Sequence, residues 1–409
     1  MLHLLNGIRV LDFTTVVLGP YATQTLADLG ADVTKVEPLL GDGFRSVRPG
    51  RSNDMGAGFM NLNRNKKSIA IDVRTQEGLA LVDAMVARAD LVVHNMRPQS
   101  AARLGIGFER LKQVNPKIAY CYTSGFGAGG RDAAEPAYDD IIQARSGLAS
   151  LNANAAGEPR FLPSIVADKV GGLHLAIGAL AAYSAREARG EAVCLEIPMF
   201  EAMVSFLMAE QLAGRSFVPP LGKMGYERLQ SPFRRPHRTQ DGFIAVLPYT
   251  TAHWERFLGL IGRKDLAADP RVLDPVERSR NIDMLYKVLD EVMISRSAED
   301  WLAELRRLDI PCAPINGLNE VFDDPHLADV GLFEEFTHPT EGEMIAIRSP
   351  FRAGQADADR PAPKLGGDTR SILAELGYGG EAIESLLERG IVAEHSTRIG
   401  NELLLPNSS

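Results

Sequence analysis

Short apolar runs alternate with helical stretches up to about residue 125. Each run is rich in β-branched residues and is bounded by turn-forming residues. The predicted strands are Arg9–Phe13, Asp32–Glu37, Ser68–Val73, Asp90–Asn95 and Ile118–Ser124. Helical periodicity covers residues 21–29 and 76–88, each between two of these strands. Strands that alternate with helices are typical of a parallel sheet, so we expect the N-terminal third to be doubly wound α/β.

The middle of the chain predicts more helix and one further strand. A helical segment is expected over residues 138–151, and Asp168 begins a long helix after it. Four apolar side chains share one face of that long helix: Val170, Leu173, Ile177 and Leu180. A strand over 194–199 leads into a helix over 201–213. Residues 214–236 are dense in Gly, Pro and Arg and are interpreted as a linker.

The pattern after the linker predicts a second, smaller unit. It begins with the hairpin-like run Gly242–Pro248, followed by helices over 252–261, 278–294 and 298–308. Another strand is expected over 343–347, and the last residues form a polar tail. Because this unit is small, we interpret it as a subdomain.

The composition of the chain argues against several functional classes of protein. The chain has 409 residues, a net charge of −9 and a pI near 5.5. An acidic protein of this kind lacks the basic face that nucleic acid or an anionic membrane requires. There is no uninterrupted apolar run of about 18 residues and no secretory signal pattern. Cys121, Cys194 and Cys312 are far apart, so neither disulfides nor zinc is indicated and we expect a cytoplasmic protein.

Common enzyme motifs are missing from the chain. There is no dinucleotide-binding G-x-G-x-x-G after a strand, no P-loop lysine, no nucleophile elbow and no H-E-x-x-H helix. The eight histidines lack ligand spacing, so no metal site is expected. The loop Gly125–Gly130 permits close backbone approach to a ligand, but it is also ordinary turn chemistry.

Asp168 carries two interpretations. It precedes Gly171 and Gly172 at the start of the long helix, so its plain role is a helix N-cap. The same position lies in the positive potential of a helix N-terminus, which favours the ionised carboxylate, and the glycines leave space for a bulky substrate. An ionised carboxylate is a competent nucleophile toward an activated acyl group.

Other charged residues offer weaker candidates. Asp139 and Asp140 form an acidic pair that either caps a helix or serves a second reacting carboxylate. Six basic residues lie near strand ends, where open α/β sheets bind ligands, although each alone is a surface charge: Arg64, Lys66, Lys67, Arg74, Arg97 and Arg103.

An ordered set of short motifs resembles the family III CoA-transferases, the CaiB/BaiF family. The likeness covers nearly the whole chain and rests on the order of the motifs, since each one alone is common. The motifs are Leu11-Asp-Phe13, Gly19-Pro20, Leu29-Gly-Ala-Asp-Val33, Lys35-Val-Glu37, Asn65-Lys-Lys-Ser-Ile69, Asn95-Met-Arg-Pro98, Arg103-Leu-Gly105, Asn115-Pro116, Ser124-Gly-Phe-Gly127, Tyr138-Asp139, Gln143-Ala144, Ser146-Gly147, Asp168 and Asp324-Pro325-His326.

The resemblance implies an α/β fold and an assembly. A large Rossmann-like CoA-binding domain would comprise residues 1–200 and 330–409, with a linker over 201–224 and a small α+β domain over 225–329. Two copies would interlock as a homodimer. The substrates would be an acyl-CoA and a small carboxylic acid, with no permanently bound cofactor, and neither nucleic acid nor membrane as partner.

The resemblance also assigns site residues. Asp168 would be the catalytic aspartate, forming an aspartyl-acyl anhydride and then an aspartyl-CoA thioester, with Asp139 as a carboxylate beside it. Eight residues match positions that contact coenzyme A or line the pocket in the formyl-CoA transferase branch: Ile71, Arg74, Asn95, Met96, Arg103, Leu104, Tyr138 and Met199. Arg103 is the one expected to bind phosphate.

Three departures from known branches bear on the substrate. Thr15 and Val17 stand where the formyl-CoA transferase pattern has His and Gln, and an Arg-rich linker around Arg235 replaces its glycine lid. Tyr138 stands where the racemase branch has a catalytic His. We therefore expect a CoA-transferase acting on an acid other than formate or oxalate. The alternatives are a 2-methylacyl-CoA racemase or epimerase, and a non-catalytic CoA-binding subunit.

Overall fold

The computed structural model describes residues 1–154, 156–353 and 357–394. The chain divides into two compact units, and each is described by itself. The larger unit combines Met1–Leu207 with Gly331–Ser409, and the smaller unit is Met208–Val330. The boundary falls inside helix α9 (Met199–Gln211).

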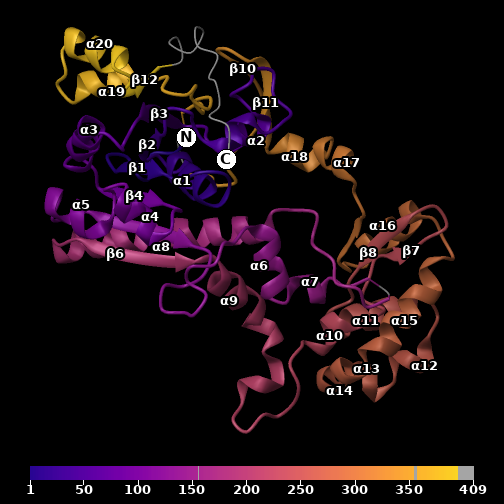
Figure 1. The fold of residues 1–409 in the computed structure, drawn as a ribbon. Helices are drawn as coiled ribbons and strands as arrows, with labels where there is room; N and C mark the ends of the chain where they lie inside the picture. The colour runs from indigo at the N-terminus through magenta and orange to yellow at the C-terminus, as the bar shows by residue number, and fades with distance from the viewer. Residues whose placement is uncertain (155, 354–356, 395–409) are drawn as a thin grey trace. The chain divides into compact units, whose positions relative to one another are not determined.

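A seven-stranded sheet forms the centre of the larger unit (Figure 1). Its order is β12-β3-β2-β1-β4-β5-β6, and every neighbouring pair is parallel except β12 with β3. The strands are β1 Arg9–Phe13, β2 Asp32–Glu37, β3 Lys66–Ile71, β4 Leu91–His94, β5 Ala119–Ser124, β6 Val193–Pro198 and β12 Val392–Ala393. The predicted parallel α/β sheet is confirmed, and its strand order reverses direction between β1 and β4.

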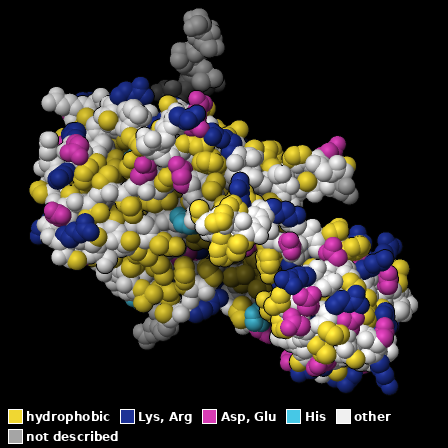
Figure 2. Space-filling model, turned by 90° about the horizontal axis from the view of Figure 1, so that it is seen from below, with side chains coloured by type: hydrophobic (Ala, Val, Ile, Leu, Met, Phe, Trp, Pro, Cys, Tyr) yellow, Lys and Arg dark blue, Asp and Glu magenta, His cyan; other side chains and the backbone are white. Residues whose placement is uncertain are grey.

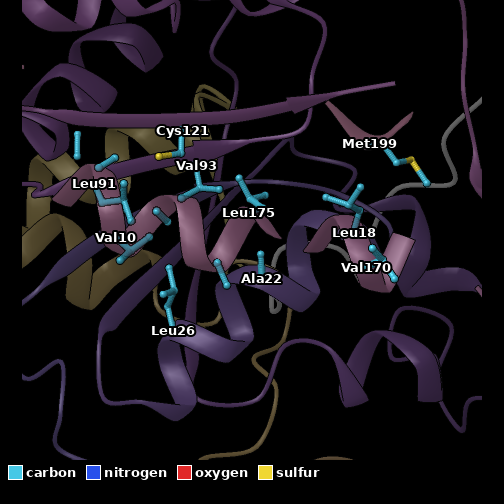
Figure 3. Packing of buried hydrophobic residues seen from close by; sticks show 14 of the residues in the cluster. Val10, Leu18, Ala22, Leu26, Leu91, Val93, Cys121, Val170, Leu175 and Met199 are labelled. Carbon is cyan, nitrogen blue, oxygen red and sulfur yellow. The ribbon is translucent and has the colours of Figure 1, made fainter. Parts of the chain in front are cut away.

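Successive residues of each strand point to opposite faces of this sheet, and apolar side chains lie on both faces. Helices therefore cover both faces. Val10, Val33 and Val93 pack with helices α1 and α8 in one core, which Figure 3 shows. Leu11 and Val92 belong to a second core with α3, α5, α19 and α20. The helices of the larger unit are α1 Leu18–Asp28, α2 Ala57–Asn61, α3 Gln76–Val86, α4 Pro98–Arg103, α5 Phe108–Val114, α6 Asp139–Arg145, α7 Leu148–Leu151, α8 Val166–Arg189, α9 Met199–Gln211, α19 Thr369–Glu375 and α20 Gly380–Glu388.

Helix α8 packs against α1 through residues with small side chains. A Cβ on Gly171 would lie 2.8 Å from Cδ1 of Leu18, and one on Gly172 would lie 2.7 Å from the Leu18 carbonyl oxygen. The two glycines therefore serve close helix packing, which corrects the expectation that they make room for substrate. The four apolar residues named above lie along one face of α8, of which Leu173 and Ile177 are exposed, whereas the buried face consists largely of Ala and Gly.

The smaller unit has its own core. Strands β7 (His237–Arg238), β8 (Phe243–Val246) and β9 (Cys312–Pro314) form an antiparallel sheet beside a cluster containing Trp254 and Trp301. Its helices are α10 Glu227–Gln230, α11 Thr251–Leu260, α12 Lys264–Ala267, α13 Pro270–Leu273, α14 Pro275–Arg280, α15 Ile282–Met293, α16 Ala298–Arg307, α17 Leu318–Phe322 and α18 Pro325–Asp329. The single helix expected over 278–294 is thus two helices, separated at Asn281.

A two-stranded hairpin belongs to the larger unit, although it follows the smaller one in the sequence. Strands β10 (Phe333–His338) and β11 (Gly342–Ile347) are antiparallel and pair along their whole length. Short 3₁₀ helices complete the regular structure at Gly43–Ser46 and Ala213–Ser216.

Candidate active site

A cavity of about 260 Å³ lies at the carboxyl ends of the parallel strands. Its wall comes from the loops that follow β1, β4 and β5, from the residues before α6, and from the first turns of α8 and α9. Open α/β sheets bind ligands where the strand order reverses, and β1 and β4 flank that point here. The lining residues are Thr15, Val16, Val17, Leu18, Asn95, Arg97, Thr123, Ser124, Gly125, Glu135, Pro136, Ala137, Tyr138, Asp168 and Met199.

Asp168 lines this cavity from the first turn of α8. The helix begins at Val166 and its N-cap is Ile165, so the interpretation of Asp168 as the N-cap is wrong. Its half-buried carboxylate accepts no hydrogen bond from any residue that the structure describes. A buried carboxylate is ordinarily paired, so an unpaired one in a cavity marks a reactive group.

The environment of Asp168 disfavours its charged form. Burial raises the pKa of the Asp168 carboxyl to about 7, and the nearby Asp139 carboxylate adds to the increase. We had expected the helix N-terminus to favour the ionised form, but these two effects act in the opposite direction. The carboxyl therefore changes its charge close to neutral pH.

Asp139 holds the start of α8 in place. Its side chain is buried, and Oδ1 accepts a 3.0 Å hydrogen bond from the backbone N–H of Asp168. The other oxygen accepts a bond from Nε2 of Gln143, whose own Oε1 accepts from the Leu162 N–H at 2.9 Å. Asp139 does not line the cavity. Its geometry suits a residue that positions the first turn of α8.

The raised pKa of Asp168 predicts a pH-dependent gain in stability for Asp168→Asn. The native carboxyl holds a proton up to about pH 7, whereas in the unfolded chain it loses the proton near pH 4. The native state therefore loses stability as pH rises between these values, and the amide avoids that loss. Allowing for partial solvent screening, we expect the variant to be about 1–2 kcal/mol more stable at pH 8 and equal to the parent near pH 3.5. Urea unfolding across this pH range measures the difference, and a constant difference would contradict the raised pKa.

The loop after β1 is tied down at three successive residues. Lys35 Nζ donates to the carbonyl oxygen of Thr14 at 2.7 Å. Both ends of the Asn95 amide bond to the backbone of Thr15, at 2.9 Å and 2.8 Å. Asp42 accepts from the N–H of Val16 at 3.1 Å. The bonds support a Val16 backbone at φ +70°, a strained region for a β-branched residue, and fix one wall of the cavity.

Beneath this loop lies a buried charge cluster of six side chains with no net charge. Its three ion pairs are Lys66 with Asp12 at 3.0 Å, Lys35 with Asp42 at 3.0 Å, and Arg45 with Glu37 at 2.7 Å. All six side chains are at most 3 % exposed. Charges buried this deeply persist only when they are paired, so the cluster is a rigid base for the cavity wall.

The structure brings together only part of the predicted site. Asp168, Asn95, Tyr138 and Met199 line one cavity. The amide of Asn95 is engaged by Thr15, as described above, and Met199 is buried while Tyr138 is exposed.

The other predicted coenzyme A residues lie outside this cavity. The side chain of Ile71 is fully buried in the core, so it offers a ligand no surface. Arg74 is exposed and forms a bidentate pair with Asp72 at 2.8 Å and 2.9 Å. Arg103 is exposed at the end of α4, and Met96 and Leu104 pack against the second core.

Sequence reasoning missed the residues that support the site. Lys35 was noted as part of a family motif, and Lys66 as a basic residue near a strand end. Neither side chain was expected to be buried. Thr123 was also missed: its hydroxyl is buried at the cavity wall and has no partner among the described residues. Alternation along each strand could have shown that these polar side chains point inward.

Two further searches bear on ligands. Within residues 1–154, 156–353 and 357–394, no cluster of three or more His, Cys, Asp or Glu side chains could hold a metal ion. In the same residues no helix is long and apolar enough to cross a membrane. The three cysteines are free.

Comparison with known proteins supplies the family. The profile of CoA-transferase family III matches residues 5–369. The chain is a family III CoA-transferase. This family III CoA-transferase is 31% identical to mouse succinyl-CoA:glutarate CoA-transferase, over 96% of this chain and 91% of the relative. It is 29% identical to a formyl-CoA:oxalate CoA-transferase of Streptomyces coelicolor, over 95% and 99% of the two chains.

Solved structures agree with this assignment. A CaiB/BaiF family protein from Brucella suis has a TM-score of 0.75 and 30% identity, covering 91% of this CoA-transferase and 99% of the other chain. Rv3272 from M. tuberculosis has a TM-score of 0.78 and 30% identity, covering 90% and 98%. The family and the enzyme class predicted from the motifs are thereby confirmed.

Proposed function

We propose that this enzyme moves coenzyme A from an acyl-CoA to a carboxylic acid through covalent intermediates on Asp168. The observation that carries the proposal is the Asp168 carboxylate, half-buried at the cavity and without a hydrogen-bond partner among the described residues. A carboxylate nucleophile divides one difficult transfer into easier steps.

The reaction balances without an added base. An oxygen of Asp168 attacks the thioester carbon, and CoA leaves as its thiolate. The thiolate attacks the aspartyl carbonyl of the resulting anhydride, which releases the donor acid as a carboxylate and leaves CoA on Asp168. The acceptor carboxylate then attacks the carbonyl carbon of this thioester, which forms a second anhydride and releases CoA again as its thiolate. The thiolate attacks the acceptor carbonyl of that anhydride, which releases the new acyl-CoA and regenerates Asp168.

The side chains of the cavity wall indicate which class of acceptor acid the cavity can hold. Thr15 and the buried, apolar Val17 both line it. We infer an aliphatic carboxylic acid longer than oxalate, because an apolar wall stabilises methylene groups and leaves the polar groups of a very small acid without partners. Relatives named for succinyl-CoA and glutarate support this class.

A racemase is the second candidate within the family. Stereoinversion needs a proton donor and an acceptor on opposite faces of the α-carbon. None of the described residues lining the cavity is a histidine. A 2-methylacyl-CoA incubated in deuterated water would gain deuterium at the α-carbon with a racemase and would not with the transferase.

Trapping the intermediate tests the proposal directly. The protein is incubated with succinyl-CoA, quenched with hydroxylamine and digested, and peptides are analysed by mass spectrometry. We expect a hydroxamate at Asp168, formed from the aspartyl thioester, and none in Asp168→Asn. CoA binding without any trapped adduct would favour the non-catalytic CoA-binding subunit.

We also infer an assembly of two copies. Figure 2 shows broad exposed hydrophobic areas on one face of the larger unit. On helix α8, Leu173 and Ile177 are 43% and 65% exposed, more than expected for apolar residues without a partner surface. Light scattering coupled to gel filtration measures the mass, and a monomer would contradict the inference.

A further inference from the structure

A long connection between β5 and α6 forms much of the cavity wall. Residues 125–138, all of which the structure describes, form neither helix nor strand. Connections of this kind are more mobile than the elements that they join, so the shape of this wall depends on the contacts that hold the β5–α6 connection in place. Its residues on the cavity are Gly125, Glu135, Pro136, Ala137 and Tyr138.

Two carboxylates hold the backbone in the first part of the connection. The N–H of Gly127 donates to Oε1 of Glu201, in the first turn of α9, at 3.0 Å. The N–H of Ala128 donates to Oε1 of Glu196, in β6, at 3.1 Å. These bonds fix the connection against β6 and α9 before it reaches the residues at 135–138.

Arg145, in the last turn of α6, contacts the connection at two separate places. Its guanidinium carbon lies 4.5 Å from the centre of the Phe126 ring and 5.2 Å from that of the Phe200 ring, at the start of α9. Nη2 of the same side chain donates to Oδ2 of Asp132 at 2.7 Å. Arg145 therefore joins an early and a middle residue of the connection to α6 and α9.

The contacts of Arg145 suit a guanidinium in particular. A planar guanidinium stacks on aromatic faces while its N–H groups pair with a carboxylate. Phe126 is 4% exposed, so water screens the contact with its ring little. The pair with Asp132 is partly exposed and alone contributes little. A lysine would keep the charge and the ion pair but would lose the planar stacking.

The helix that carries Arg145 also reaches the proposed nucleophile. Asp139, in the first turn of α6, accepts the hydrogen bond from the Asp168 N–H. Arg145, at the other end of α6, holds the connection that leads into this helix. The cavity wall at 135–138 and the first turn of α8 are therefore both attached to α6.

We propose that Arg145 is a positioning residue, which holds the β5–α6 connection so that the cavity wall orients the acid substrate beside Asp168. Arg145 is not among the described residues that line the cavity, so it acts through the connection and not by contact with the substrate. The inference rests on the proposed function, since it takes the cavity as the site of CoA transfer.

Selectivity between acids tests the proposal. Transfer from succinyl-CoA is measured with malonate, glutarate and adipate, in the parent enzyme and in Arg145→Gln. A misplaced wall should lower kcat/KM about 10–100-fold for the preferred acid and by different factors for the others, because acids of different length meet different parts of the wall. A mere loss of folded protein would lower all three values by one factor. Arg145→Lys should recover part of the selectivity, because it keeps the ion pair with Asp132.

Hydrogen exchange gives a second readout that needs no activity. Amides over 125–138 should exchange about 10-fold faster in Arg145→Gln than in the parent, with those of α8 unchanged. The matched control is Arg131→Gln, an exposed arginine of the same connection, which should alter neither readout. One common factor for all three acids, or unchanged exchange over 125–138, overturns the proposal. If the connection loosens as expected but the parent itself transfers CoA to no acid, the proposed function is refuted instead.

Discussion

Replacing Asp168 with alanine is expected to lower kcat for CoA transfer by about 10³-fold or more. In the proposed mechanism this carboxylate forms the bond to both the acyl group and CoA, and no other carboxyl among the described residues of the cavity wall lies at the start of α8. Asp168→Asn should be equally inactive, because an amide does not replace a carboxylate as nucleophile. CoA exchange between succinyl-CoA and glutarate, followed by chromatography, measures the rate.

The neighbouring acids provide the control. Asp140 is exposed beside the buried Asp139, and Asp140→Asn should retain full activity. If both Asp168 variants keep parental kcat while folding normally, the covalent mechanism is wrong. If Asp140→Asn loses activity as well, the effect reports the folding of α6 and not the chemistry of one carboxylate.

Replacing Lys35 with methionine should destabilise the protein by about 3–5 kcal/mol. Lys35 is fully buried and balances Asp42 and Asp12, so its loss leaves uncompensated negative charge in the core. It also removes the hydrogen bond to the Thr14 carbonyl oxygen. The midpoint of urea unfolding, converted with a constant m value, measures the change.

Two further variants test the cause of the lower stability of Lys35→Met. Lys67→Met removes a partly exposed lysine on the neighbouring strand, paired with Asp32 at 3.1 Å, and should cost less than about 1 kcal/mol. Adding Asp42→Asn to Lys35→Met should recover part of the loss, because it removes one of the unbalanced charges. An equal loss of unfolding free energy in Lys35→Met and Lys67→Met would contradict the expectation that burial of the lysine sets the size of the loss.

Strands β1, β2, β4 and β5 could be predicted closely because each is a short and largely buried run. The bounds of β1 and β2 match the expected ones, whereas β3 begins at Lys66, two residues before the predicted start. Lys66 looked like a loop residue because its side chain is charged, yet its pairing with Asp12 permits burial at a strand end. The helical segment over 138–151 is two helices because Gly147 adopts φ +92° between them. Such turns depend on tertiary packing and not on periodicity.

Asp168, the proposed nucleophile, lines the cavity, whereas the residues around it were predicted less well. Asp168 could be named because the ordered family motifs pointed to it, whereas its local pattern alone favoured a helix N-cap, which the structure does not bear out. The bonds of Asn95 to Thr15, and of Asp42 to Val16, join residues far apart in the chain, so no local pattern encodes them.

The close contact between Gly171 or Gly172 and α1 has a consequence for how such an enzyme could change its substrate. The spacing of the two helices depends on the absence of a side chain at Gly171 and Gly172, which lets the side chain and carbonyl oxygen of Leu18 approach α8 closely. Mutations at Thr15, Val17 or Tyr138 can therefore alter the shape of the pocket without moving the helix that carries Asp168. A lineage can vary the acid it accepts while its reaction chemistry stays constant, and engineered substrate changes should begin at those three positions.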